Sequence, residues 1–305
     1  MDIKKIRSAS HAGSWYSASS SELKSQINSF LEKAKENPNK FQIEKNPTKI
    51  LKSLIVPHAG FRYSGPTASH SFTNINKSLY KRVVILGPSH HEYIEGCGLS
   101  KFEEIETPLG NLKIDIEANN KLKALKHFNF IDENTDEEEH SLEMQYPFLK
   151  NAFGESDVKF LPIMVGEINN NLGEIANSLM EYYRDKSTLF VISSDFCHWG
   201  KRFRYTYYDK NDGKIFDSIE NLDKMGMKAI ESLDPQNFID YLNVYKNTIC
   251  GRRPITLLLG IIAKFNRENN LNQNVEDGID LEKIDNIIKF VEYNQSSKVI
   301  EANDS

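Results

Sequence analysis

The chain has 305 residues, of which 39% are hydrophobic, and this supplies enough apolar side chains for one large domain with a continuous core. The 38 Lys and Arg residues stand against 43 Asp and Glu, a formal net charge of −5, so the composition excludes the basic surplus that nucleic-acid or anionic-membrane binding needs. No apolar run reaches the length of a bilayer-spanning helix and the 3 cysteines form no CxxC pair, so we expect a cytoplasmic protein with reduced thiols and no membrane insertion.

The first predicted element is an amphipathic helix over residues 20–36. Its apolar side chains recur at helical spacing, and Ser19 and Glu22 are spaced as in a capping box. Residues 37–48 contain two prolines among polar side chains, which indicates a surface connection.

Two short apolar runs come next, at residues 51–57 and 82–88, and both are typical of buried parallel strands. We expect a helix between them that begins after Gly65-Pro66, so that the three segments form a βαβ unit. Because both strands run in the same direction, their carboxyl ends should meet at one edge of the sheet.

The same arrangement is predicted further along, with strands over residues 158–165 and 188–194 around a helix at 171–184. The rest of the chain is predicted to form three helices and a last strand-like run, at residues 213–231, 235–245, 253–266 and 289–293. This alternation predicts an α/β fold, a single domain over residues 1–305 with a mainly parallel central sheet flanked by helices.

Polar side chains follow three of these strands at the point where each strand ends. His58 follows the first, His90 the second, and Asp195 and His198 the last. Taken singly, each histidine is better explained by a bond to a loop carbonyl, which is the more common role, but ligands of α/β proteins bind at such strand ends. Adjacent residues in an extended loop face opposite ways, and we choose His90 over His91 because it has the same offset from its strand as His58. We interpret Asp195 as a metal ligand or as a group that orients an imidazole, and His198 as a proton-transfer group.

Cys250 lies just before a predicted helix, whose N-terminus should lower the pKa of the thiol and favour the thiolate. Two imidazoles and a thiolate make a suitable ligand set for zinc, copper or iron. A buried, inert cysteine is the alternative, and it is the interpretation we give to Cys197, which alternates away from Asp195.

Three further features stand apart from the strand ends. The acidic run at residues 136–139 is predicted to be a solvated face at a helix N-terminus. His140 and Glu143 are three residues apart on one helical face, either as a pair that supports the site or as a helix-cap histidine beside a solvated glutamate. Trp15 either fills the core or forms a wall that faces a ligand.

The motifs together resemble those of the MEMO family, named for mediator of ErbB-receptor-driven cell motility. The resemblance runs nearly end to end and is carried by ordered blocks at residues 11–16, 57–60, 86–91, 139–144, 193–200, 222–227 and 247–252. It implies a fold similar to class III non-haem iron extradiol dioxygenases, with a pocket at one edge of the sheet. The chain ends short of a final strand that we expect in this family.

The resemblance also implies a metal-binding pocket, with ligands at His58, His90 and Cys250, with Asp195 and His198 beside them, and with Trp15 on the wall. It implies iron or copper, with zinc as a further option, redox chemistry, links to cell motility and cytoskeletal signalling, and binding of phosphotyrosine peptides. The related dioxygenases use two histidines and a carboxylate, whereas Cys250 supplies a softer thiolate here. Extradiol ring cleavage is therefore not expected.

Three functions stay open on these residues. The first is a metal-dependent oxidoreductase in which Asp195 and His198 are the catalytic groups. The second is a signalling adaptor without turnover, in which the same pocket binds a phosphotyrosine-containing or acidic peptide with help from Arg252. The third is nucleophilic catalysis by Cys250 with His90 or His198 as the base.

Overall fold

The computed structural model describes residues 4–36, 50–273 and 286–301, and the predicted surface connection at residues 37–48 lies outside them. The strands in this part of the chain are β1 (Ile6–Arg7), β2 (Ser53–Val56), β3 (Arg82–Pro88), β4 (Cys97–Leu99), β5 (Glu104–Ile105), β6 (Leu112–Ile114), β7 (Phe128–Phe130), β8 (Lys159–Val165) and β9 (Thr188–Ser193). The α-helices are α1 (Ser20–Glu36), α2 (Phe61–Phe72), α3 (Ile116–Lys123), α4 (Glu133–Glu138), α5 (His140–Glu143), α6 (Tyr146–Phe153), α7 (Leu172–Arg184), α8 (Ile215–Glu231), α9 (Pro235–Tyr245) and α10 (Arg252–Gln273).

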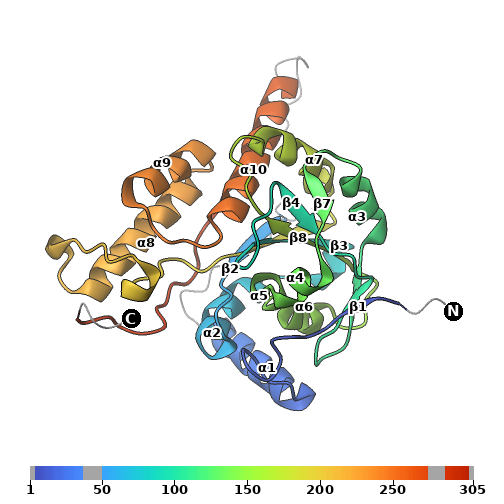
Figure 1. Cartoon of the computed structure of the whole chain (residues 1–305), viewed down its shortest axis with the longest axis horizontal. Coiled ribbons are helices and arrows are strands. Elements are labelled where there is room, and N and C mark those ends of the chain that lie inside the picture. Colours follow the sequence, from blue (N-terminus) through green and yellow to red (C-terminus); the bar gives the residue numbers. More distant parts are fainter. Residues whose placement is uncertain (1–3, 37–49, 274–285, 302–305) are drawn as a thin grey trace.

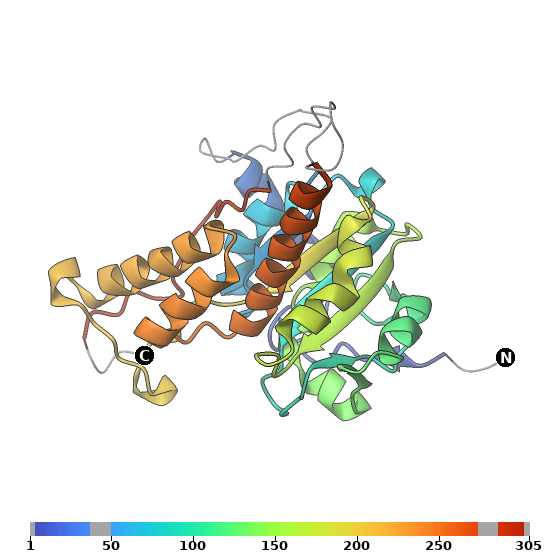
Figure 2. The same ribbon diagram turned by 90° about the horizontal axis from the view of Figure 1, so that it is seen from above.

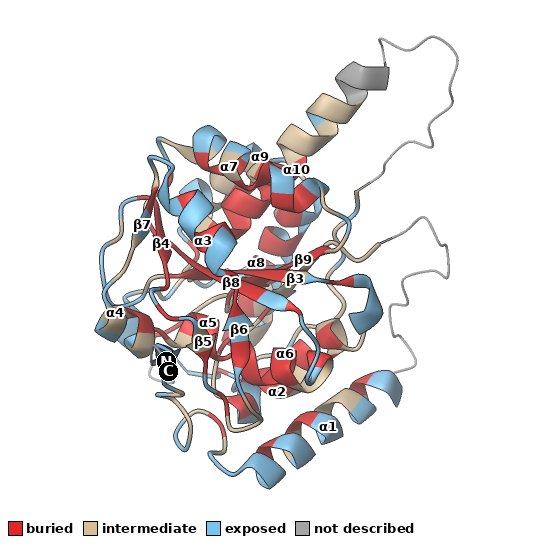
Figure 3. Ribbon diagram, turned by 90° about the vertical axis from the view of Figure 1, so that its right-hand side faces the viewer, coloured by how far each residue is buried: buried red, intermediate tan, exposed pale blue. Residues whose placement is uncertain are grey.

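The strands form one mainly parallel sheet with helices on both faces, which confirms the predicted α/β class (Figure 1). The order is β1-β5-β6-β8-β3-β9-β2, and off this path β4 pairs with β7 and β8. Only the β4–β8 and β5–β6 pairs are antiparallel among the described strands. Figure 3 shows α7 and α10 on one side of the sheet and α1, α2 and α6 on the other. Helices α8 and α9 lie beside each other at one flank, followed by α10 (Figure 2).

The central strands bury side chains on both faces, as strands covered by helices on each side must. In β3, Val84 and Leu86 belong to the core under α7 and α10, whereas Val83 and Ile85 belong to the core under α1, α2 and α6. Strand β9 alternates in the same way, because successive side chains of a strand point to opposite faces. These continuous apolar runs are what made the parallel strands predictable.

Most predicted elements are present, with boundaries that move by a few residues. Helix α1 begins directly after Ser19, whose hydroxyl accepts the Glu22 N–H, but Glu22 accepts from the Ser17 hydroxyl, so the reciprocal half of the predicted capping box is not formed. The C-terminal extension of α10 to Gln273 goes beyond the predicted end at 266. Among the described residues, no helix is long and apolar enough to cross a bilayer.

One predicted helix boundary and one predicted strand-like run are wrong. Helix α2 begins at Phe61 rather than after Gly65-Pro66, and it contains Pro66. Glycine suits position 65 because an added Cβ would lie 2.3 Å from a ring carbon of Phe30 in α1, which would have to move. The predicted strand-like run at 289–293 forms no strand of the sheet, and its Phe290 N–H donates to the Glu231 side chain on α8.

Candidate metal centre

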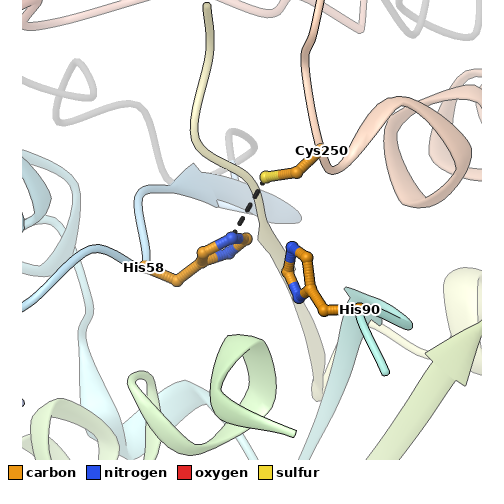
Figure 4. Close-up of side chains that lie close together, drawn as sticks. All are labelled: His58, His90 and Cys250. Atoms are coloured by element: carbon orange, nitrogen blue, oxygen red, sulfur yellow. Dashed lines mark hydrogen bonds between the residues drawn. The ribbon is translucent and has the colours of Figure 1, made fainter. Parts of the chain in front are cut away.

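Three neighbouring strands bring the predicted ligands to one edge of the sheet. Strand β9 pairs in parallel with both β2 and β3, so the carboxyl ends of all three strands lie together. His58 and His90 each come two residues after their strands, and Cys250 comes two residues before α10. One donor atom from each of these three side chains lies within 4.8 Å of the other two (Figure 4).

The tautomer of His58 follows from a chain of hydrogen bonds beneath it. The Ser193 hydroxyl donates its proton to the Ser141 carbonyl at 2.6 Å and accepts from the Gln145 amide at 2.9 Å. His58 Nδ1 lies 2.8 Å from the same oxygen and must therefore be the donor, because the hydroxyl has only one proton to give. The lone pair of His58 is thus on Nε2, which lies 3.1 Å from the Cys250 sulfur.

The ring of His90 is held by Glu139, which the sequence did not single out as part of the site. The two carboxylate oxygens accept from His90 Nδ1 at 2.8 Å and from the His90 backbone N–H at 2.7 Å. Burial alone would raise the pKa of Glu139, but the hydrogen bonds and charge of His90 and the Ser141 N–H outweigh it and lower the pKa to about 2. An ionised carboxylate can only accept, so Nδ1 carries the proton and Nε2 is free.

These contacts correct the interpretation of residues 136–139 as a solvated face. Glu139 is 1% exposed and Asp136 is 2% exposed, and Asp136 pairs with the guanidinium of Arg7, which is itself fully buried. Only Glu138 of this run is exposed at the surface, with Glu137 between the two extremes. The first and last residues of the run, Asp136 and Glu139, are therefore buried, and only Glu138 is fully exposed to solvent.

The surroundings of Cys250 raise the pKa of its thiol, which opposes the thiolate that the helix N-terminus was predicted to favour. Burial, and then the charge of Asp195, raise the pKa of the thiol, and they outweigh the backbone N–H groups of Asp195 and Gly251. Burial also lowers the pKa of His58 to about 4, so that ring is neutral at physiological pH. A neutral imidazole and a thiol that gives up its proton on binding are the usual states of metal ligands before and during loading.

Asp195 and His198 lie beside the three donors rather than among them. Asp195 accepts the His58 backbone N–H at 2.8 Å, and its own N–H donates to the Cys250 sulfur at 3.3 Å. His198 Nδ1 lies 3.1 Å from the Thr248 carbonyl, so this ring too carries its proton on Nδ1. Both residues occupy the loop that follows β9 and fix its path past the donors.

A stack of aromatic rings extends from His90 to Trp15. The rings of His90 and His140 have centroids 4.4 Å apart, and those of His140 and Trp15 are 4.5 Å apart. One ring, that of His140, therefore separates Trp15 from the donor His90. The predicted pairing of His140 with Glu143 is not formed, since Glu143 turns into the core.

Glu143 accepts hydrogen bonds from Arg7, His11 and Tyr16 in a buried network. Burial would raise the pKa of Glu143, but these donors, led by His11, lower the pKa to about 2. The network ties the N-terminal segment to α5 and so sets the position of Trp15. A single sequence offers no signal for it, because its members are more than 120 residues apart in the chain.

The match to known proteins covers almost the whole chain. A family model described as Memo-like protein matches residues 7–305. The protein MEMO1 of Xenopus laevis is 42% identical over 295 residues, which are 96% of this chain and 91% of that protein. Human MEMO1 is 41% identical over the same shares of both chains. The memo-1 homolog of Caenorhabditis elegans is 38% identical over 98% of this chain and 79% of its own length.

Proposed function

This chain belongs to the Memo-like protein family, and we propose that its His58, His90 and Cys250 bind an ion of iron or copper, with zinc as a further option. The proposal rests mainly on which ring nitrogen of His58 and of His90 has its lone pair available. Both histidines hold their protons on Nδ1 through Ser193 and Glu139, which leaves Nε2 of each ring for a metal. This arrangement is the usual one for histidine ligands, whose second nitrogen donates to a carboxylate or hydroxyl.

The spacing of the donors also fits a metal. Bond lengths of about 2.0–2.1 Å to nitrogen and 2.3 Å to sulfur, at a tetrahedral angle, separate the two atoms by roughly 3.5 Å. The 3.1 Å between His58 Nε2 and the Cys250 sulfur therefore needs only a small outward movement of the thiol. A soft thiolate beside two imidazoles suits copper, zinc and iron and not magnesium or calcium.

We propose a redox function for the centre. Iron or copper held by these residues would supply one-electron chemistry. Cys250 would release its thiol proton to solvent on binding the metal. Asp195 holds the backbone of His58 by accepting its N–H, and His198, with its proton on Nδ1, would offer Nε2 for proton transfer. Extradiol ring cleavage is not proposed, because Cys250 stands where the related dioxygenases are expected to have a carboxylate. The likeness of the fold to those enzymes remains a prediction.

Elemental analysis of protein purified without oxygen and without chelator tests the proposal. We expect near-stoichiometric iron, copper or zinc in the unchanged protein and little in the Cys250→Ser and His90→Ala variants. The matched control is His91→Ala, which removes the adjacent imidazole, an exposed ring outside the donor group. Equal metal content in all four proteins would rule the centre out.

The other functions implied by family resemblance remain predictions. These are the links to cell motility and cytoskeletal signalling, and the alternative of a non-enzymatic adaptor that binds phosphotyrosine or acidic peptides. Titration with a phosphotyrosine peptide and its unphosphorylated twin tests the adaptor, and equal affinities would remove it. A cytoplasmic location is proposed from the free cysteines, which suit a reducing compartment. Nucleophilic catalysis by Cys250 is disfavoured because burial raises the pKa of that thiol.

A further inference from the structure

Two loops that carry residues of the candidate centre are hydrogen-bonded to each other along their length. The Asp195 N–H, in the loop after β9, donates to the Cys250 sulfur, in the loop before α10, at 3.3 Å. The His198 N–H of the first loop donates to the Thr248 hydroxyl of the second at 2.7 Å. The loops approach so closely that a Cβ added to Gly251 would lie 2.3 Å from a side-chain atom of the loop after β9. The path of one loop therefore limits the path of the other.

A carboxylate from a third element connects the same two loops. Asp223 of α8 accepts the Cys197 N–H at 3.1 Å and the Asn247 amide at 3.0 Å, both on Oδ1. Its other oxygen accepts the Tyr293 hydroxyl of the C-terminal segment at 3.1 Å. One side chain thus binds residues that lie 24 to 70 positions from it in the chain.

The position of this carboxyl is costly for folding. Asp223 is 3% exposed, and among the described residues no lysine, arginine or histidine forms an ion pair with it. A buried carboxyl without a cation lowers the stability of the folded state once it ionises. An apolar side chain would avoid that cost, but it would leave the Cys197 N–H and the Asn247 amide without this acceptor. What Asp223 contributes is therefore the connection between the loops.

We propose that Asp223 is a positioning residue for Cys250, which it holds in place by joining the loop before α10 to the loop after β9. Asn247, the residue that it binds in the first of these loops, comes three positions before Cys250. Asp223 is outside the donor group itself, so it acts on a metal only through the position of the thiol. The inference rests on the proposed metal function for the purpose of that position, whereas the connection between the loops needs no metal. It also gives a role to residues 222–227, one of the blocks that carry the family resemblance.

The rate at which Cys250 is alkylated tests this positioning without a metal. The metal-free, full-length protein and its variants are treated with iodoacetamide, and each cysteine is followed by mass spectrometry of its peptide. Asp223→Leu places methyl groups where the two oxygens are, and we expect at least about tenfold faster alkylation of Cys250 because its loop opens more often. Asp223→Asn keeps one oxygen for Cys197 and Asn247 and should restore the slow rate.

Two controls separate positioning from a general loss of stability. Cys97 in β4 is fully buried, so its alkylation reports global unfolding in the same sample. Asp115→Leu removes another buried carboxylate, which caps α3 and pairs with Arg82 at the start of β3, and it should leave the rate at Cys250 unchanged. If Cys97 also reacts faster in Asp223→Leu, then Asn247→Ala, which breaks the same connection from the other side, decides in its place.

A competition titration of zinc against a chelator relates this position to the metal. Asp223→Leu should bind zinc at least about tenfold more weakly than the unchanged protein and Asp223→Asn, as expected for loss of an outer support of a ligand.

An unchanged rate at Cys250 in the deciding variant overturns the proposal. Faster alkylation with unchanged zinc affinity also overturns it, since the position of the thiol would then not matter for binding. If the unchanged protein binds no zinc, the metal function fails, and the alkylation rates alone decide whether Asp223 positions Cys250.

Discussion

Replacing Glu139 by glutamine is the sharpest test of how the protein orients its metal ligands. The carboxylate receives three hydrogen bonds, from His90 Nδ1, the His90 N–H and the Ser141 N–H. An amide has one oxygen and one NH₂ group, so it cannot accept at both positions. In one orientation the NH₂ group faces the His90 N–H, and in the other it faces Nδ1 and drives the proton of the ring to Nε2.

The second orientation places a proton on the nitrogen that we propose to bind the metal. Loss of such outer hydrogen bonds typically weakens metal affinity 10- to 100-fold, which is about 1.4–2.7 kcal/mol. We expect Glu139→Gln to fall in this range, whereas Glu138→Gln changes the adjacent exposed carboxylate and should leave metal affinity unchanged.

The measurement is a competition titration with a chelator of known affinity, using zinc as a metal that does not change its oxidation state. Thermal unfolding of the metal-free proteins is measured alongside, so that a loss of folding is not mistaken for a loss of affinity. If Glu139→Gln bound zinc as tightly as the unchanged protein and as Glu138→Gln, the argument from the tautomer of His90 would be refuted.

Three further predictions concern stability, measured as the free energy of unfolding in urea. Burial raises the pKa of Asp223 from 3.8 to about 7 and outweighs the hydrogen bonds that the carboxylate accepts. The folded state therefore holds this proton more tightly than the unfolded state, and the protein loses stability as pH rises from about 4 to 7. Asp223→Asn should abolish this loss and gain up to about 4 kcal/mol above pH 7. Glu143→Gln should cost about 3–5 kcal/mol because it leaves the buried Arg7 with one carboxylate fewer. Gly65→Ala should cost about 1–3 kcal/mol, since its Cβ meets the aromatic ring on α1.

Each of these predictions has a control within the chain. For Asp223→Asn the comparison is its own pH profile, and a gain that is the same at pH 4 and pH 8 would contradict the assigned pKa. Glu181→Gln removes an exposed carboxylate of α7 and should cost less than about 1 kcal/mol; a similar cost for Glu143→Gln would mean that its network contributes little. Gly173→Ala, at a helical position with no atom within 4 Å of the added Cβ, should be neutral or stabilising, and an equal cost at both glycines would disprove the steric argument.

The parallel strands could be predicted because their side chains are buried on both faces. Residues 82–88 form β3 with the predicted bounds. The strands predicted at 158–165 and 188–194 differ by at most one residue at either end from β8 and β9. Residues 97–130 gave no comparable signal, since β4 to β7 are two or three residues long and gain their stability from sheet partners. Only the tertiary contacts define strands this short.

The three candidate ligands, His58, His90 and Cys250, could be predicted from the sequence, through strand-end positions and the family resemblance. The residues that support it were not. Gln145, Ser193 and Glu139 act through hydrogen bonds between segments 48 to 135 residues apart, and no local spacing encodes these pairs. The burial of Cys250, which reverses the predicted ease of ionisation, depends equally on how α10 packs on the sheet.

The sequence by itself determined the α/β class, the strand ends that carry His58 and His90, and the family. These depend on the local alternation of apolar side chains and on motifs of a few adjacent residues. The tertiary structure alone decided which nitrogen of the His58 and His90 rings faces the site, and that burial raises the pKa of the Cys250 thiol. Protonation states and pockets depend on burial and on hydrogen bonds between distant segments, and those exist only once the chain has folded.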